Sequence, residues 1–318
     1  MIAIALLAGF TLLLIGGEAT LRGAVGLGRA LGLSKLLVGM VIVGIGTSLP
    51  ELTVAVDAVI SGYPNLAVGN VLGSSIANAL FILGIAGLIN PVDRPARLLL
   101  PNATIIVVVA AGVALLGWRG VIGPREGLFM LAAYVALLTA EYLRAREEAR
   151  LKTLVTAQVP LPDEVPSRPA VALLLVASGL GCLYLGADLL IEGAVGVARI
   201  IGVTEGLIGL TVVSFGSTLP ELVSAVVASR KGDSEVAFGN VLGSILFNLL
   251  AVLGTASLTG TLLFPPVMVW FDGTVLTAAC VLMIVFTLSG RGLSRTEAAV
   301  MIAAYVIYIF ARFAYGLF

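Results

Sequence analysis

One stretch of this sequence occurs twice, and no other feature constrains the fold as strongly. The first copy reads Gly-Thr-Ser-Leu-Pro-Glu-Leu at 46–52 and Gly-Asn-Val-Leu-Gly-Ser-Ser-Ile-Ala-Asn at 69–78. The second copy reads Gly-Ser-Thr-Leu-Pro-Glu-Leu at 216–222 and Gly-Asn-Val-Leu-Gly-Ser-Ile-Leu-Phe-Asn at 239–248. The copies align without a gap at an offset of 170 residues (216 minus 46), and 11 of the 19 positions from 66 to 84 are identical to their counterparts. We therefore expect two halves with a common fold.

The composition places the chain in a membrane. Hydrophobic residues make up 59% of the 318 residues, charged residues only 11%, and the mean hydropathy is +1.13. Soluble domains carry about 25% charged residues, so we predict an all-α integral membrane protein and expect no nucleic-acid partner. Cys182 and Cys280 lie in apolar runs and are expected to be free thiols. We expect no cofactor, and because histidine is absent any proton-coupled step would use carboxylates.

Apolar stretches long enough to cross a bilayer as helices number ten. They lie at 1–22, 36–60, 66–89, 98–117, 124–144, 170–192, 204–229, 236–259, 266–288 and 294–315. Five fall in each half, so we expect an N-terminal five-helix repeat at 1–144 and a C-terminal five-helix repeat at 170–318. The stretch between them, 145–169, is charged and then proline-rich, which predicts a solvated cytoplasmic linker.

Lysine and arginine are distributed unevenly between the two ends of the predicted helices. If the linker is cytoplasmic, 14 of the 18 basic residues lie inside, and four lie outside, namely Arg119, Arg125, Arg199 and Arg312. The positive-inside rule then places both termini outside. Since each half has an odd number of spans, the second half enters the membrane in the opposite sense. The halves are thus expected to be inverted repeats, which are common in secondary transporters.

Each copy of the repeat holds one glutamate within apolar sequence. Glu51 lies between the apolar stretches 36–45 and 52–60, and Glu221 is placed in the same way. A charge at that depth costs about 3 kcal/mol on insertion scales, so such a residue is expected to be functional. Two carboxylates about 6 Å apart also repel by about 3 kcal/mol at an effective dielectric of about 20. We expect an empty site to resist occlusion and bound cations to neutralise it, which would enforce exchange.

Neutral oxygen atoms accompany both glutamates. Pro50 and Pro220 each remove a backbone donor and displace the carbonyl four residues earlier. Carbonyl groups freed at membrane depth need a partner, and a cation is one that suits them. Hydroxyl groups lie beside these carbonyls at Thr47, Ser48, Ser217 and Thr218. Hard oxygen ligands of this kind suit Na⁺ and Ca²⁺.

The second part of each motif supplies a hydroxyl and an amide one helical turn apart. In the first half these are Ser74 and Asn78, and in the second half Ser244 and Asn248. Residues at this spacing point to the same side of a helix. Glycines also recur every four residues, at 69, 73, 239 and 243, which lets helices approach closely enough to share ligands.

At these residues the sequence resembles the Ca²⁺/cation antiporter superfamily, and most closely its sodium/calcium exchanger branch. The first copy is similar to the family's alpha-1 repeat and the second to its alpha-2 repeat, and the resemblance covers nearly the whole chain. It implies the sodium/calcium exchanger fold, in which the second, third, seventh and eighth helices surround a cluster of cation sites. It also implies that the long first and sixth helices slide across this core to switch access.

The resemblance further implies a set of ion ligands within the motif ranges 44–78 and 214–248. Glu51 and Glu221 would be shared between Ca²⁺ and Na⁺. The other ligands would be backbone carbonyls, hydroxyls and amides, at Gly44, Thr47, Ser48, Ser74, Asn78, Ser214, Ser217, Thr218, Ser244 and Asn248.

One position departs from some members of the superfamily. Several, including the potassium-dependent exchangers, carry aspartate at the place of Asn248, whereas this chain has asparagine in both halves. This argues against K⁺ co-transport. The proton-coupled branch commonly has an acidic residue or histidine in its second motif, and the absence of both here favours Na⁺ over protons.

The expected function is secondary active antiport of Na⁺ against Ca²⁺ by alternating access. We expect it in the cytoplasmic membrane of a prokaryote, with a single chain sufficient. A Ca²⁺(cation)/H⁺ antiporter on the same scaffold is the alternative, and a cation channel suits two buried charges less well. An enzyme is not expected, because the sequence holds no serine-histidine, paired-aspartate or zinc-binding arrangement.

Three further acidic residues lie near helix ends or interfaces. Glu18 and Asp188 are counterparts in the two halves, and Glu18 can pair with Arg22 four residues later. Asp57 lies near the outer end of its predicted helix, where it either is simply solvated or attracts cations. We expect structural or interfacial roles at these positions.

Overall fold

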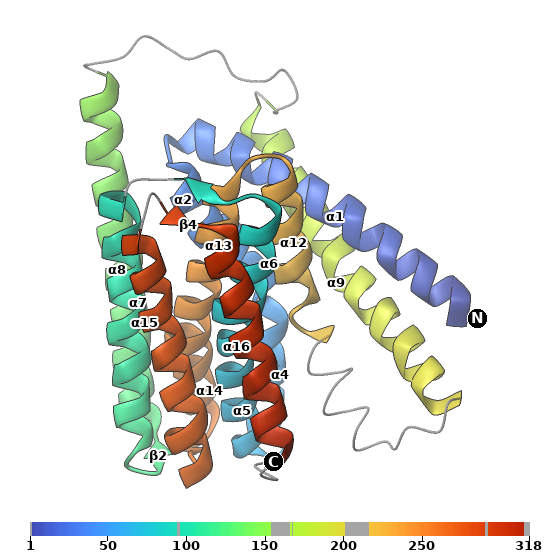
Figure 1. The fold of residues 1–318 in the computed structure, drawn as a ribbon, viewed down its shortest axis with the longest axis vertical. Coiled ribbons are helices and arrows are strands. Elements are labelled where there is room, and N and C mark those ends of the chain that lie inside the picture. Colours follow the sequence, from blue (N-terminus) through green and yellow to red (C-terminus); the bar gives the residue numbers. More distant parts are fainter. Residues whose placement is uncertain are drawn as a thin grey trace.

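The computed structural model describes residues 2–93, 96–153, 166, 168–200, 216–289 and 292–314 (Figure 1). The first half contains α1 (Ile2–Leu31), α2 (Lys35–Leu37), η1 (Val38–Val43), α3 (Gly44–Thr47), α4 (Leu49–Ile60), α5 (Pro64–Ile76), η2 (Ala77–Ile82), α6 (Leu83–Ile89), β1 (Val92–Asp93), α7 (Ala96–Gly117), β2 (Val121–Ile122) and α8 (Pro124–Thr153). The second half contains α9 (Pro169–Ile200), α12 (Leu219–Arg230), α13 (Ser234–Leu246), η4 (Phe247–Val252), α14 (Leu253–Thr259), β3 (Leu262–Leu263), η5 (Met268–Gly273), α15 (Thr274–Ser289), β4 (Gly292–Leu293) and α16 (Arg295–Ala314). The described chain is thus almost entirely helical.

Two continuous helices form the centre of the bundle. One comprises α5, η2 and α6, and the other comprises α13, η4 and α14. Within the apolar segment of the first helix, 72% of the residues are buried inside the protein, and within that of the second, 100% are. The corresponding shares are 22% for α1 and 33% for α9. The duplicated Gly-Asn motifs therefore lie in the interior of the protein, where sequence this apolar packs against protein rather than lipid.

The helices α1 and α9 form a separate pair on the flank of the bundle. They run side by side and obliquely to the other helices (Figure 1). Glycines permit this contact, because a Cβ atom built on Gly16 would lie 2.8 Å from the carbonyl oxygen of Gly179. The pair contacts the rest of the protein mainly through α12 and η1.

Short antiparallel strand pairs tie together connections at opposite ends of the bundle (Figure 1). Strand β1 pairs with β4, with Val92 opposite Leu293, and β2 pairs with β3, with Val121 opposite Leu263. Each pair joins a connection of the first half to a connection of the second half.

The helix that contains the first glutamate is broken, as its proline predicts. The run from Lys35 to Thr47 and the run from Leu49 to Ile60 meet at Ser48 with a bend of 42°. Proline is the second residue of α4, where its missing N–H interrupts no helical hydrogen bond. The predicted span at 36–60 is therefore two helical pieces.

Three predicted boundaries are wrong. Helix α9 continues to Ile200 instead of ending near residue 192. Helix α1 continues to Leu31 instead of ending near residue 22, and it stops before Gly32, whose φ of +68° suits glycine. Helix α8 continues to Thr153, into the predicted linker. The alanine, glutamate, arginine and leucine of that stretch are strong helix formers, and they extend the helix without an apolar face.

The described ranges contain seven helices long and apolar enough to span a membrane, or up to eight if the bent pair counts as one span. The protein is therefore a multi-pass helical membrane protein. Ten spans arranged as inverted repeats remain a prediction, and much of the seventh predicted helix, residues 204–215, lies outside the described residues.

Candidate cation site

Each half presents its glutamate from the first turn of a helix that follows a break. Ser48 precedes α4 with φ −91° and ψ 8°, and Thr218 precedes α12 with φ −91° and ψ 2°. Glu51 and Glu221 then lie in the first turn of these helices. The unpaired N–H groups and the dipole of a helix N-terminus stabilise a carboxylate at this position. The same backbone geometry thus positions both glutamates.

The two glutamates are buried next to each other without a cationic side chain. Both are 0% exposed, and their charges repel. The ion pairs of the described residues include neither of them. Ser48 Oγ donates a hydrogen bond to Glu221 Oε1 at 2.9 Å, whereas Glu221 Oε2 and both carboxylate oxygens of Glu51 have no hydrogen-bond partner in the described structure. Buried carboxylates in this condition need a bound cation or protons.

Further hydrogen bonds join predicted site residues of opposite halves. Ser244 Oγ donates to the carbonyl oxygen of Gly44 at 3.3 Å, and Asn248 Nδ2 donates to Ser74 Oγ at 3.0 Å. The partners in these bonds are 200 and 174 residues apart. Together with the bond from Ser48 to the opposite half, they show that both copies of the motif converge on one place.

The predicted amide ligands lie at equivalent places in the two halves. Asn78 is the second residue of the π-helical segment η2, and Asn248 is the second residue of η4. Both are 0% exposed, and the Oδ1 atom of each lacks a hydrogen-bond partner among the described residues. Asn78 Nδ2 donates to the carbonyl of Ser74 at 3.0 Å. Short π-helical segments occur often at functional sites, because they turn side chains out of the regular helical register.

For the other predicted ligands the structure gives fewer contacts with site residues. Thr47 is 1% exposed, and its hydroxyl lies 3.0 Å from the carbonyl oxygen of Val43. Thr218 is 3% exposed, and Ser217 beside it is half-buried. Ser214 lies outside the described residues, so its role as a ligand stays a prediction.

Glycines allow α13 to approach α2 and η1 closely, as predicted for the second half. A Cβ atom on Gly239 would lie 2.2 Å from the carbonyl oxygen of Leu36, and one on Gly243 would lie 2.1 Å from that of Met40. The first half differs. Gly69 faces the side chain of Met268, and no described atom lies within 4 Å of a Cβ on Gly73.

One site residue, Asn240, was missed in the sequence. It is 1% exposed, its Oδ1 accepts a hydrogen bond from Thr47 Oγ1 at 3.4 Å, and its Nδ2 donates to the carbonyl of Glu221 at 3.2 Å. The signal was present, because Asn240 is the asparagine of the duplicated Gly-Asn pair and lies one turn before Ser244.

A buried carboxylate outside the two motifs was also missed in the sequence. Asp272 in η5 is 2% exposed, forms an ion pair with Arg312 and accepts a hydrogen bond from Tyr308 Oη at 2.9 Å. A lone acid within the apolar stretch 266–288 satisfies the same criterion that singled out Glu51. Unlike Glu51, it is neutralised by the protein itself.

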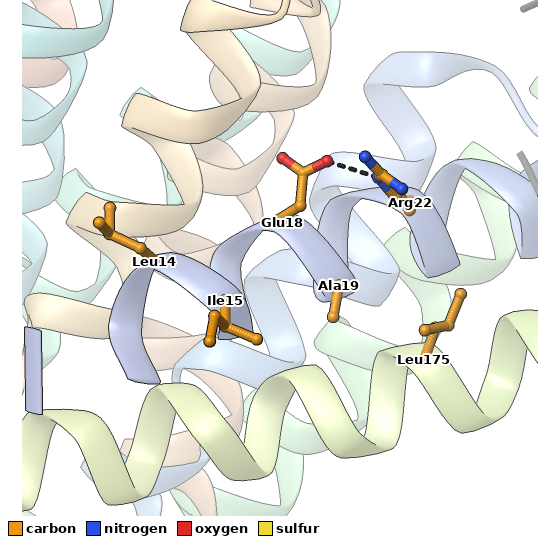
Figure 2. A pocket seen from close by; sticks show the side chains of 6 residues that line it. All are labelled: Leu14, Ile15, Glu18, Ala19, Arg22 and Leu175. Atoms are coloured by element: carbon orange, nitrogen blue, oxygen red, sulfur yellow. Dashed lines mark hydrogen bonds and ion pairs between the residues drawn. The ribbon is translucent and has the colours of Figure 1, made fainter. Parts of the chain in front are cut away.

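The other acidic residues singled out in the sequence, Glu18, Asp57 and Asp188, are not among the residues that make up this site. The predicted ion pair between Glu18 and Arg22 is present, and Lys231 also pairs with Glu18. Figure 2 shows Glu18 and Arg22 beside a groove of about 420 Å³ lined by Leu14, Ile15, Glu18, Ala19, Arg22 and Leu175. The groove lies on α1 and α9 and contains none of the predicted ligands. Asp57 and Asp188 are exposed, and both cysteines are free thiols as predicted.

The donor set at the candidate site is dominated by neutral oxygen atoms. Within the described ranges, no group of three or more Asp, Glu, His or Cys side chains is placed to hold a metal ion. Two carboxylates supplemented by hydroxyl, amide and carbonyl oxygens are typical of weak, exchangeable sites for hard cations rather than of tight transition-metal sites.

Known proteins resemble this chain along almost its whole length. Residues 1–143 and 171–314 match the family described as sodium/calcium exchanger protein. The chain is 30% identical over 315 residues to the putative antiporter CaxA of Alkalimonas amylolytica, covering 96% of this chain and 97% of that protein. It is 27% identical to the sodium/calcium exchanger MaX1 of Methanosarcina acetivorans, covering 97% of both. Its fold is similar to a solved structure of the sodium-calcium exchanger NCX_Mj, with a TM-score of 0.83, 25% identity, and coverage of 97% of this chain and 99% of that one.

Proposed function

The chain belongs to the sodium/calcium exchanger protein family of cation antiporters, and we propose that it exchanges Na⁺ for Ca²⁺ across a membrane by alternating access. One observation carries this proposal. Among the described residues, buried acceptor oxygens without a hydrogen-bond donor occur at Glu51 Oε1 and Oε2, Glu221 Oε2, Asn78 Oδ1 and Asn248 Oδ1. These atoms come from both copies of the motif, and all of them carry lone pairs that a cation would satisfy.

The charge of the site suits the two proposed substrates. One Ca²⁺ ion balances the two negative charges of Glu51 and Glu221, whereas each Na⁺ ion balances one of them. The same two carboxylates can therefore bind either substrate. The neutral ligands of the proposed set are the carbonyl groups of Gly44 and Ser214, the hydroxyls of Thr47, Ser48, Ser74, Ser217, Thr218 and Ser244, and the amides of Asn78 and Asn248. When the site is empty, two uncompensated charges oppose its occlusion in a medium of low dielectric. This links passage between the two faces to ion binding and yields exchange rather than leak.

We also propose the topology inferred from the sequence. Residues 1–144 and 170–318 form five-span halves of opposite orientation, joined by a cytoplasmic linker at 145–169, and both termini face the outside of a prokaryotic cytoplasmic membrane. The distribution of lysine and arginine supports this orientation. An epitope attached to either terminus is then accessible in intact spheroplasts. Accessibility only after permeabilisation contradicts the orientation without affecting the exchange function.

The function is tested with purified protein in lipid vesicles. Vesicles loaded with Na⁺ and diluted into Na⁺-free medium with ⁴⁵Ca²⁺ should accumulate Ca²⁺, and dissipating the Na⁺ gradient should stop the uptake. Collapse of an imposed pH gradient should leave the uptake unchanged. Uptake driven by a proton gradient in the absence of Na⁺ would instead establish the alternative, a Ca²⁺(cation)/H⁺ antiporter. No uptake under either gradient contradicts both.

A further inference from the structure

Asn240 bridges the two halves of the molecule at the candidate site. It lies on α13, is 1% exposed, and contacts Thr47 of the first half with its carbonyl oxygen and the backbone of Glu221 with its amide nitrogen. Thr47 and Asn240 are 193 residues apart in the sequence. A side chain with one donor and one acceptor engaged in different directions holds both partners in a defined orientation.

The contact with Thr47 affects which atoms remain available to a cation. The Thr47 hydroxyl has one hydrogen and several acceptors within reach: the carbonyl of Val43 at 3.0 Å, the carbonyl of Gly44 at 3.4 Å, Oδ1 of Asn240 at 3.4 Å, and the carboxylate of Glu221. A hydroxyl that coordinates a cation uses a lone pair and points its hydrogen away from the ion. Donation to Asn240 accomplishes this and keeps the Thr47 hydrogen off the carbonyl oxygen of Gly44, a proposed ligand that already accepts from Ser48 N and Ser244 Oγ.

The contact with Glu221 acts on the backbone that presents the carboxylate. Asn240 Nδ2 donates to the carbonyl oxygen of Glu221, which is in the first turn of α12 directly after the break at Thr218. The first turn of a helix is held by few hydrogen bonds of its own and frays easily. The bond from Asn240 therefore fixes the direction in which the Glu221 side chain leaves the helix.

We propose that Asn240 is a positioning residue of the cation site, which orients the Thr47 hydroxyl and the Glu221 backbone without coordinating the ion. This inference rests on the exchange function proposed above and extends it to a residue outside the predicted ligand set. The effect of Asn240 is exerted through the geometry of its two partners, so its loss changes the affinity for Ca²⁺ more than it changes the fold.

The chain supplies a matched control in the other copy of the motif. Asn70 is the counterpart of Asn240 in the repeated Gly-Asn pair, and it is half-buried. Its Nδ2 has no hydrogen-bond partner among the described residues. Residue type and motif position are the same, whereas the bridging hydrogen bond of the amide and the burial of the side chain differ. The substitution Asn70→Ala therefore reports the effect of shortening this side chain without breaking that bridge.

The experiment compares Asn240→Ala, Asn240→Asp and Asn70→Ala in reconstituted vesicles. The measured quantity is the Ca²⁺ concentration that gives half-maximal Na⁺-dependent uptake. Asn240→Ala should raise it roughly two- to tenfold, the range expected for losing one to two net hydrogen bonds, and Asn70→Ala should raise it less. Asn240→Asp has nearly the same shape as the native residue, so it keeps an acceptor for Thr47 but cannot donate to Glu221. It should also raise the half-maximal concentration.

The outcomes separate the possible roles of this side chain. If Asn240 coordinates the ion, the added carboxylate of Asn240→Asp will strengthen Ca²⁺ binding, which overturns the positioning role. An unchanged half-maximal concentration in Asn240→Ala, or an equal shift in Asn70→Ala, also overturns it. Thermal unfolding of each variant in detergent without Ca²⁺ identifies a purely structural effect, which lowers the melting temperature and leaves the half-maximal concentration unchanged. Failure of the native protein to take up Ca²⁺ contradicts the proposed function instead.

Discussion

Asp272 and Glu221 are both buried within the helical bundle, but their charges are compensated in different ways. Asp272 is held by the guanidinium of Arg312 and the hydroxyl of Tyr308. The carboxylate of Glu221 accepts a hydrogen bond from Ser48 and interacts with the hydroxyl of Thr47, and the charge that acts on it is that of another carboxylate, Glu51. A carboxylate whose charge is neutralised by a side chain of the same protein contributes to the structure. A pair of carboxylates with no cationic side chain beside it has its charge neutralised only by ions from solution. Burial alone does not distinguish the two cases, but the partners do.

The physical cost of each arrangement explains the difference. Removing a charge from water costs several kcal/mol, and a partner inside the protein recovers this energy only if the geometry is good. The network around Asp272 recovers it permanently, and it connects η5 to α16. In the function proposed above, the energy at the glutamate pair is recovered only while the carboxylates are neutralised by a bound cation, which couples occupancy to conformation. The following predictions test this contrast, from the largest effect to the smallest.

Glutamine at either glutamate should abolish transport. With Glu51→Gln or Glu221→Gln, a bound Ca²⁺ ion faces one carboxylate instead of two, and losing one member of a buried charge pair costs about 2–5 kcal/mol. We expect Na⁺-dependent ⁴⁵Ca²⁺ uptake to fall by at least about 30-fold, since each 1.4 kcal/mol is a factor of ten. Asp272→Asn is the control at the other buried acid and should retain uptake per folded molecule. Native flux in either glutamine variant removes that glutamate from the site.

Breaking the Asp272 ion pair should affect stability instead of transport. Arg312→Met leaves a buried carboxylate uncompensated, which costs about 3–5 kcal/mol of unfolding free energy. The double variant Asp272→Asn with Arg312→Met removes both charges and should recover much of this loss. Chemical unfolding in detergent measures both effects. If Arg312→Met proves as stable as the native protein but transports no Ca²⁺, Asp272 belongs to the transport machinery and the contrast fails.

Calcium should stabilise the native protein through the glutamate pair. A ligand at about 100 times its dissociation constant adds about 2.7 kcal/mol to the unfolding free energy. We therefore expect the melting temperature in detergent to rise with Ca²⁺ and to fall again with a chelator. The increase should vanish in Glu221→Gln and persist in Arg312→Met. An increase that survives in Glu221→Gln would locate the stabilising ion elsewhere.

The smallest effect is expected at Ser48. Its hydroxyl donates the hydrogen bond at 2.9 Å to Glu221 Oε1, and hydrogen bonds to charged groups contribute about 1.5–3 kcal/mol. Ser48→Ala should raise the half-maximal Ca²⁺ concentration roughly tenfold, with stability in the absence of Ca²⁺ little changed. Ser178→Ala is a matched control, because its exposed hydroxyl bonds only to the backbone of its own helix at Leu175. Equal effects of the two substitutions would exclude a specific role for Ser48.

Local pattern was sufficient for much of the architecture. The positions of apolar runs predicted helices close to those observed for α5 to α6 and for α13 to α14, and Pro50 predicted the break before Glu51. The three boundary errors, at the ends of α1, α8 and α9, have a local origin as well. The glycine-containing stretch at the end of α1 and the charged stretch of strong helix formers at the end of α8 both remain helical, because no helix-breaking residue interrupts them.

The sequence by itself determined that this is a membrane protein with a duplicated motif, each copy of which holds one glutamate within apolar sequence and several neutral oxygens. These properties follow from composition, periodicity and repetition, which are local and can be counted along the chain. Only the tertiary structure decided which polar groups meet: Asn240 with Thr47 and Glu221, and Asp272 with Arg312. Such pairings depend on how helices pack across distances of tens to hundreds of residues, and no local pattern encodes that packing. A buried acid proposed to hold an ion and one that pairs with an arginine therefore look alike until the chain is folded.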